Sequence, residues 1–154
     1  MNFHRNRQLL SCYFEGDPTI EECLRFAGPI PFLKRPENMA MSTQQWGFTS
    51  SLIAIDHLKK FSFLTLLSFE DQKALLGQVF ILISILFDAQ RAHEEKREYI
   101  SFPDGTGIID YDPSKFSHSF ENRISSKLIG RVNELRVTNE EFVLLSMVIM
   151  CNPG

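Results

Sequence analysis

The chain of 154 residues is poor in cysteine, and its few cysteines lie far apart, at Cys12, Cys23 and Cys151. No two of them form a Cys-x-x-Cys pair, which argues against a zinc finger and a redox dithiol. An odd number of unpaired thiols is typical of a reducing compartment. The four histidines are His4, His57, His93 and His118. They show no metal-ligand spacing either, so no metal and no cofactor is expected.

The chain also lacks a basic excess. It has 16 Lys and Arg against 19 Asp and Glu, a net charge of −3. Proteins that grip nucleic acid through its phosphates normally carry a positive surplus, so no direct nucleic-acid contact is expected from this chain. No long apolar run follows the basic N-terminus, as a secretory signal would require.

Membrane-spanning runs are missing as well. The most apolar stretch, residues 74–87, has 11 hydrophobic residues of 14 and is bounded by Lys73 and Asp88. It is shorter than the ~20 residues that a spanning helix needs. We therefore expect no membrane contact and a helix that is buried on nearly every side.

Motifs for catalysis are absent too. His93-Glu94 begins like a metalloprotease helix, but Arg97 stands at the second histidine position. No Gly-x-Ser-x-Gly nucleophile motif occurs. Gly105-Thr-Gly107 is too short for a phosphate loop and is typical of a hairpin turn. We expect no catalytic residues and no enzyme.

What the chain does have is phenylalanine, 14 residues in all, together with many helix signals. Thr19 and Glu22 fit a capping box that opens a short helix to about Phe26, and residues 27–42 are expected to form a loop. Apolar residues on more than one face predict a packed helix over residues 43–61. Ser68 opens the next helix, which should run through residues 74–87 towards His93.

The periodicity then changes. Residues 99–102 and 108–111 predict two short strands around a glycine-rich turn. Asp112-Pro113 predicts a new helix start, and residues 119–134 a further helix. A last helix from Phe142 to Cys151 follows the cap at Thr138. The sequence therefore predicts helices in layers with one small hairpin.

One spacing is specific enough to point to a family. The run from Ile55 through Lys59 and Leu64 to Asp71-Gln72-x-x-Leu75-Leu76 resembles the core motif of nuclear receptor ligand-binding domains. Further likenesses follow in order along nearly the whole chain. These likenesses are Phe80 and Arg91 in the long central helix, the hairpin at Phe102-Pro-Asp-Gly105, and the closing run from Leu135 to Pro153. The opening residues are similar to those of the expanded nematode branch of the family.

The resemblance implies a groove for a short coregulator helix. Lys59 would cap the carboxyl end of that helix, whose free carbonyls and partial negative charge suit an ammonium group. The implied groove residues are Ile55, Lys59, Phe69, Gln72, Lys73 and Leu76. Family grooves add a glutamate from a last helix, which this chain does not contain. The alternative is that Lys59 and Lys60 are merely solvated at a helix end.

The resemblance also implies a ligand pocket, in which Arg91 would hold a carboxylate or hydroxyl with two parallel hydrogen bonds. The implied lining residues are Trp46, Ser50, Ile81, Ser84, Ile85 and Arg91. Two alternatives stay open. One is that Arg91 pairs with Asp88, Glu94 or Glu95, and the other is that the remaining residues are plain core.

The implied fold is an all-α layered helical sandwich of nuclear receptor ligand-binding domain type, with one small β-hairpin. Residues 1–154 would form a single partial domain without the zinc-finger module and the C-terminal helices, and residues 142–151 would expose an apolar face that favours association. The implied function is a nuclear, and also cytoplasmic, transcription regulator. Its partners would be a fatty acid or sterol-like ligand, a coregulator helix and a receptor dimer partner. The alternative is a ligand-independent interaction module whose cavity is filled by its own Phe side chains.

Overall fold

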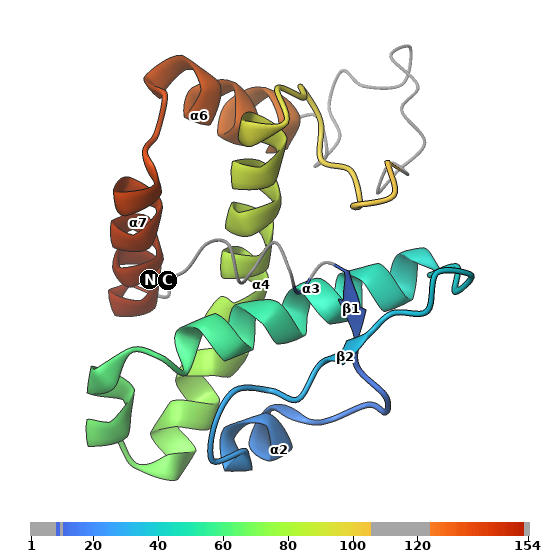
Figure 1. Ribbon diagram of the computed structural model, residues 1–154. Helices are drawn as coiled ribbons and strands as arrows, with labels where there is room; N and C mark the ends of the chain where they lie inside the picture. The colour runs from blue at the N-terminus through green and yellow to red at the C-terminus, as the bar shows by residue number, and fades with distance from the viewer. Residues whose placement is uncertain (1–8, 10, 106–123, 153–154) are drawn as a thin grey trace. The chain divides into compact units, whose positions relative to one another are not determined.

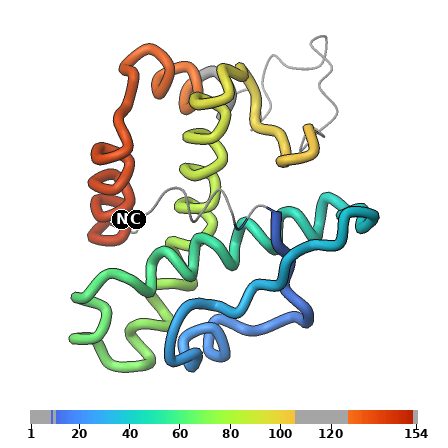
Figure 2. The backbone as a smooth tube through the Cα atoms, viewed as in Figure 1, coloured from blue at the N-terminus to red at the C-terminus, as the bar shows by residue number. Residues whose placement is uncertain are grey.

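The computed structural model describes residue 9, residues 11–105 and residues 124–152, and these are mostly helical (Figure 1). The chain divides into two compact units, residues 1–84 with 148–154, and residues 85–147. The smooth backbone trace in Figure 2 follows the same elements along the chain. The helical class with one small antiparallel strand pair is thereby confirmed.

The strand pair joins β1 (Cys12–Tyr13) to β2 (Leu33–Lys34), with Cys12 opposite Lys34 and Tyr13 opposite Leu33. Strands of two residues leave no alternating pattern of apolar and polar residues, so periodicity does not predict them. Of the hairpin predicted at residues 99–111, Ser101 makes a β-bridge, and residues 106–111 lie outside the described part of the chain. The helix start at Asp112-Pro113 and residues 119–123 lie outside it too.

Helix α2 (Ile20–Arg25) opens with the predicted capping box. The Thr19 hydroxyl accepts from the Glu22 backbone N–H at 3.2 Å, and the Glu22 carboxylate accepts from the Thr19 N–H at 2.7 Å. Two orphan donors of the first turn are thus satisfied reciprocally. The helix is nevertheless only six residues long, and isolated helices of that length are not stable in water. Its contacts with the rest of the unit must hold it.

Helix α3 (Thr43–Leu58) begins at a second capping box, formed by Ser42 and Gln45. All seven residues from Leu52 to Leu58 are buried, including Asp56 and His57. Burial of seven consecutive residues means that this part of α3 is covered on every side, as the sequence predicted. The 3₁₀ turn η1 (Ser62–Leu66) then leads to α4.

Helix α4 (Phe69–Glu94) starts after Ser68, whose hydroxyl accepts from the Asp71 N–H at 3.2 Å. Leu76, Val79 and Ile83 are fully buried, but Ile81 and Leu82 are 54% and 46% exposed. The prediction of a helix buried on nearly every side is therefore wrong for one face. The apolar positions of residues 74–87 continue around the helix, and periodicity alone does not say which face is covered.

With 26 residues, α4 is long and apolar enough to cross a membrane by length and composition. The apolar run of the sequence was too short for this because the helix continues beyond it at both ends. The core helix of a soluble protein meets the same criterion, so length and composition alone do not assign α4 to a membrane.

In the second unit, the end of α4 packs against the π-helical segment η3 (Ile124–Ile129), which continues into α6 (Gly130–Leu135). The apolar cluster there is made by Ala89, Ala92 and Ile129, with Ile100 and Leu128 against it. Helix α7 (Asn139–Cys151) follows the predicted cap at Thr138. Leu144 is 59% exposed on it, so part of its apolar face is open.

His57 gives the first testable prediction. Burial lowers its pKa to about 4, with Lys60 acting in the same direction and Asp56 opposing. The unfolded chain, with a His pKa near 6.5, binds the proton more readily, so stability falls as the pH drops from about 6.5 towards about 4. At about pH 5 the loss is about 2 kcal/mol.

Urea denaturation of the wild type and of His57→Gln at about pH 7 and about pH 5 measures this loss. The variant should lose less stability on acidification than the wild type. Asp88 works in the opposite direction, because burial raises its pKa to about 6 against the effect of Arg91. It is present in both proteins and cancels in the comparison. Equal losses of stability in the wild type and the variant would contradict the assignment of this pH dependence to His57.

Candidate functional site

Lys59, at the end of α3, binds the chain's own backbone. Its Nζ donates to the carbonyl oxygens of Cys23 at 2.6 Å, Phe26 at 3.1 Å and Gly28 at 3.1 Å. An ammonium group has three donors, and all three are accounted for. The Nζ also lies 5.7 Å from the centroid of the Phe26 ring. Lys59 is therefore not simply solvated, and it caps the carboxyl end of α2.

The pKa of Lys59 reflects this position. Burial lowers the pKa below its usual range, while Asp56 and Cys23 act to raise it. The carbonyls supply the hydrogen bonds that the ammonium gives up with water. Lys60, the next residue, forms an ion pair with Asp56 at 2.9 Å, and the Asp56 side chain is 1% exposed. The two neighbouring lysines thus have distinct roles.

Helix α2 lies against the first turns of α4 as well. Lys73 Nζ is 3.3 Å from the carboxylate of Glu21, and the guanidinium of Arg25 lies 5.1 Å from the ring centroid of Phe69. Hydrogen bonds from Arg25 and Lys73 lower the pKa of Glu21. A polar rim therefore runs along one side of α2.

Apolar side chains of α2 face the same helices. The Cδ1 atom of Ile20 is 3.7 Å from the point where a Cβ on Gly77 of α4 would stand. Cys23 is fully buried. Residues 20, 23 and 24 share one face of a helix, since positions three and four apart are neighbours. Figure 1 shows α2 beside α3 within this unit.

A cavity of about 580 Å³ remains beside α2. It is lined from one side by Leu24, Phe26, Ala27, Gly28 and Pro29, and from the other by Asp56, Lys59, Lys60, Leu64, Thr65 and Gln72. The amide of Gln72 donates to the Leu67 carbonyl at 3.0 Å, which fixes its side chain at the edge of the cavity.

The residues expected to form a groove thus lie together in the first unit. Lys59, Phe69 and Lys73 contact α2, Gln72 lines the cavity beside it, and Ile55 and Leu76 are 3% and 0% exposed.

Sequence reasoning missed two anchors of this arrangement, Glu21 and Asp56. Asp56 Oδ1 accepts from the Ile30 N–H at 2.7 Å and so ties down the loop after α2. The signal for Asp56 was a lone carboxylate amid apolar residues of a packed helix, where a charge needs a partner. Glu21 carried no comparable signal.

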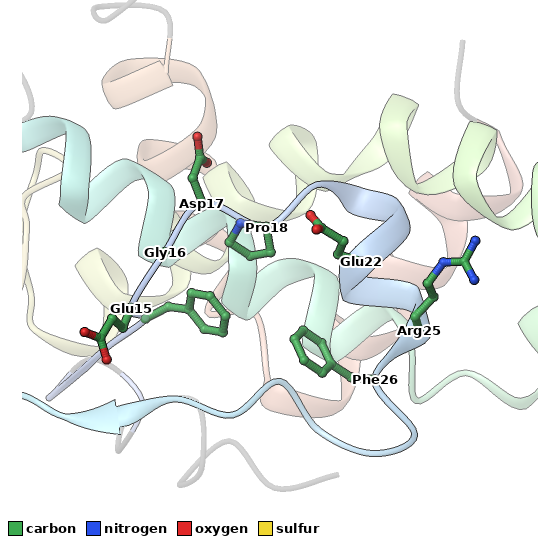
Figure 3. A pocket seen from close by; sticks show the side chains of 8 residues that line it. Glu15, Gly16, Asp17, Pro18, Glu22, Arg25 and Phe26 are labelled. Carbon is green, nitrogen blue, oxygen red and sulfur yellow. The ribbon is translucent and has the colours of Figure 1, made fainter.

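A second cavity of about 530 Å³ lies on the solvent side of α2 (Figure 3). It is lined by Phe14, Glu15, Gly16, Asp17, Pro18, Glu22, Arg25 and Phe26. Glu22 and Arg25 belong to α2, while Asp17 and Glu15 come from the segment before the helix. None of the predicted site residues lines this cavity.

The residues predicted for a ligand pocket divide between the two units. Trp46, Ser50, Ile81 and Ser84 belong to the first, and Ile85 and Arg91 to the second. Trp46 and Ser84 are buried, and Arg35 stacks on the Trp46 ring at 4.7 Å, whereas Ile81 is 54% exposed. The role of the six residues as a ligand pocket stays a prediction.

Arg91 is 8% exposed and bound within its own unit. Its Nη2 lies 3.0 Å from the Asp88 carboxylate and donates to the Ser101 carbonyl. The ion pair with Asp88 is therefore present, and the role of Arg91 in holding a ligand stays a prediction. The neighbouring Arg97 donates to the Ser101 hydroxyl at 2.8 Å. Among the described residues, no group of three or more His, Cys, Asp and Glu side chains is gathered for a metal ion.

Comparison with known proteins identifies the family. The model for the ligand-binding domain of nuclear hormone receptors matches residues 32–154. The chain belongs to the nuclear hormone receptor family. Its helical class agrees with such a domain, and all the predicted groove residues on α3 and α4 lie inside the matched stretch.

Similar receptors come from Caenorhabditis elegans. Nuclear hormone receptor family member nhr-167 is 37% identical over 91% of this chain and 41% of its own length. Family member nhr-9 is 33% identical over 99% of this chain and 46% of its own. The chain therefore spans less than half of these receptors. No solved structure matches it.

The position of Lys59 gives a second prediction. Lys59→Met keeps the length of the side chain but removes the ammonium, which leaves three carbonyls at the end of α2 without that donor. We expect a loss of about 2 kcal/mol in the free energy of unfolding, measured by urea denaturation. Lys34→Met, on the exposed strand β2, removes the same charge and should cost no more than about 0.5 kcal/mol. Equal effects of the two variants would contradict the capping role.

Proposed function

We propose that this chain is the ligand-binding and coregulator-binding domain of a nuclear receptor-like transcription regulator that acts in the nucleus. It is not an enzyme on this proposal, and it takes part in transcription by docking a short helix of a coregulator protein on α3, η1 and α4. The single observation that carries the proposal is that this surface already holds a short amphipathic helix, α2, by its carboxyl end and along its apolar face.

The chemistry of the surface suits such a partner. The last carbonyls of a helix have no partner inside the helix and carry partial negative charge, so the Lys59 ammonium satisfies both requirements. Ile55 and Leu76 supply buried apolar surface between the charged residues. Lys73 and Phe69 offer a cation and a ring at the edge, which orient a helix that carries opposite charge.

A lipophilic ligand, fatty acid or sterol-like, is the second part of the proposal. It would bind among Trp46, Ser50, Ile81, Ser84, Ile85 and Arg91 and shift the population of the coregulator-competent state through its differential affinity for that state. A receptor dimer partner is proposed as well, on the family alone.

One observation favours the alternative of a ligand-independent interaction module. The Arg91 guanidinium is engaged by Asp88 and the Ser101 carbonyl, so a ligand carboxylate has to compete with a buried carboxylate for it. Native mass spectrometry of the purified chain, combined with thermal shift on adding fatty acids or sterols, separates the two. A copurifying lipid or a rise in Tm supports the receptor function, and a clean apo mass with no shift supports the module.

Coregulator binding is tested by fluorescence anisotropy with a labelled amphipathic peptide that has leucines at its first, fourth and fifth helical positions. We expect saturable binding, and none for the matched peptide with the three leucines changed to alanine. A benzophenone on the peptide's apolar face should cross-link to residues of α3, η1 or α4. Equal binding of both peptides, or cross-links confined to other elements, would overturn the proposed groove.

A further inference from the structure

The helix that occupies the surface of α3, η1 and α4 is part of the same chain. Along α2 the apolar residues Ile20, Cys23 and Leu24 stand at positions one, four and five, the pattern of a short helix that docks by one face. Ile20 reaches Gly77 of α4, Cys23 is fully buried, and Leu24 lines the cavity with Gln72. The same three positions carry the leucines of the peptide described above.

The direction in which α2 lies also matches that expected of a docked coregulator helix. Its carboxyl end meets the Lys59 ammonium, which is the end that a docked helix presents to a cation. Its second residue, Glu21, meets Lys73, and its sixth, Arg25, covers the Phe69 ring. All of these groove residues lie inside the stretch matched by the receptor family, whereas α2 precedes residue 32, where that match begins.

We infer that α2 is a built-in occupant of the coregulator groove, and that an external helix docks only after α2 has left. The inference rests on the proposed function of that groove. It also specifies the partner: a helix with apolar residues at positions one, four and five, an acidic residue at position two facing Lys73, and free carbonyls for Lys59. The position-two acid is a preference that the groove residues impose on any occupant.

The contacts that hold α2 are weak enough for an external helix to replace it. The Glu21 and Lys73 side chains are 38% and 43% exposed, and that of Arg25 is 65% exposed. Ion pairs at such exposure are weak. The cavity beside Leu24 leaves the groove only partly filled. An external helix with larger side chains at positions four and five than Cys23 and Leu24 therefore has apolar surface still to cover.

The test releases α2 without touching the groove. Glu21→Lys replaces the attraction to Lys73 by repulsion, on a residue that lies outside the apolar face. Hydrogen-exchange mass spectrometry should show faster exchange of the amides at residues 22–25, and the labelled leucine peptide should bind about fivefold more tightly. Glu37→Lys, on an exposed loop, makes the same charge change and should alter neither measurement.

The double variant Glu21→Lys with Lys73→Glu is the rescue. It restores opposite charges between α2 and α4, and protection of the α2 amides should return. Saturating peptide on the wild type should in turn deprotect residues 22–25. Unchanged exchange of α2 in Glu21→Lys, or a peptide that binds while α2 stays protected, would overturn the inference.

The two proposals fail separately. If Glu21→Lys frees α2 and the double variant restores it, α2 is docked as inferred even when no peptide binds any variant, and that result overturns the coregulator function instead. If the peptide binds the wild type and Glu21→Lys equally, with cross-links on α3 and α4, the coregulator function stands and the competition by α2 is refuted. Exchange of the buried amides of α3 serves as the check that every variant is folded.

Discussion

The first unit depends on one ammonium group. Three backbone carbonyls converge on Lys59 from a segment 31 to 36 residues earlier in the chain. A six-residue helix has little stability of its own, so α2 exists because its carboxyl end is capped from outside and its apolar face is covered. Asp56, three residues before Lys59, holds the following loop through the Ile30 N–H. The end of α3 therefore organises the segment that precedes it.

Local signals in the sequence predicted the local structure well. The capping box at Thr19 and the caps at Ser68 and Thr138 each open a helix, because a cap depends only on residues three positions apart. The two-residue strands and the exposed face of α4 at Ile81 were not predictable in this way. Both depend on which distant segment covers a residue, and no periodicity records that.

The same difference between local and distant contacts decides how much of the candidate site is predictable from the sequence. The resemblance to receptor domains pointed to residues at the end of α3 and in α4 that the structure places beside α2, since their spacing within two consecutive helices is written in the sequence. It did not identify what Lys59 binds, because the carbonyls of Cys23, Phe26 and Gly28 are backbone atoms that every residue type supplies. Arg91 is similar in part: its pairing with Asp88, three positions away on one helix, is visible in the sequence, whereas its hydrogen bond to the Ser101 carbonyl depends on where the chain places residue 101.

The properties that let the groove hold α2 are those that let it release α2. A tethered segment competes at an effective concentration that is typically millimolar, so a strongly bound α2 would exclude any partner of ordinary affinity. The partly exposed ion pair to Lys73, the short helix and the incompletely filled cavity all keep that intramolecular binding weak. Because α2 binds weakly, part of the molecules have an open groove, and the affinity for an external helix is the intrinsic affinity multiplied by that open fraction. Selectivity gains from the same arrangement, because a partner must then bind better than a helix that already satisfies Lys59.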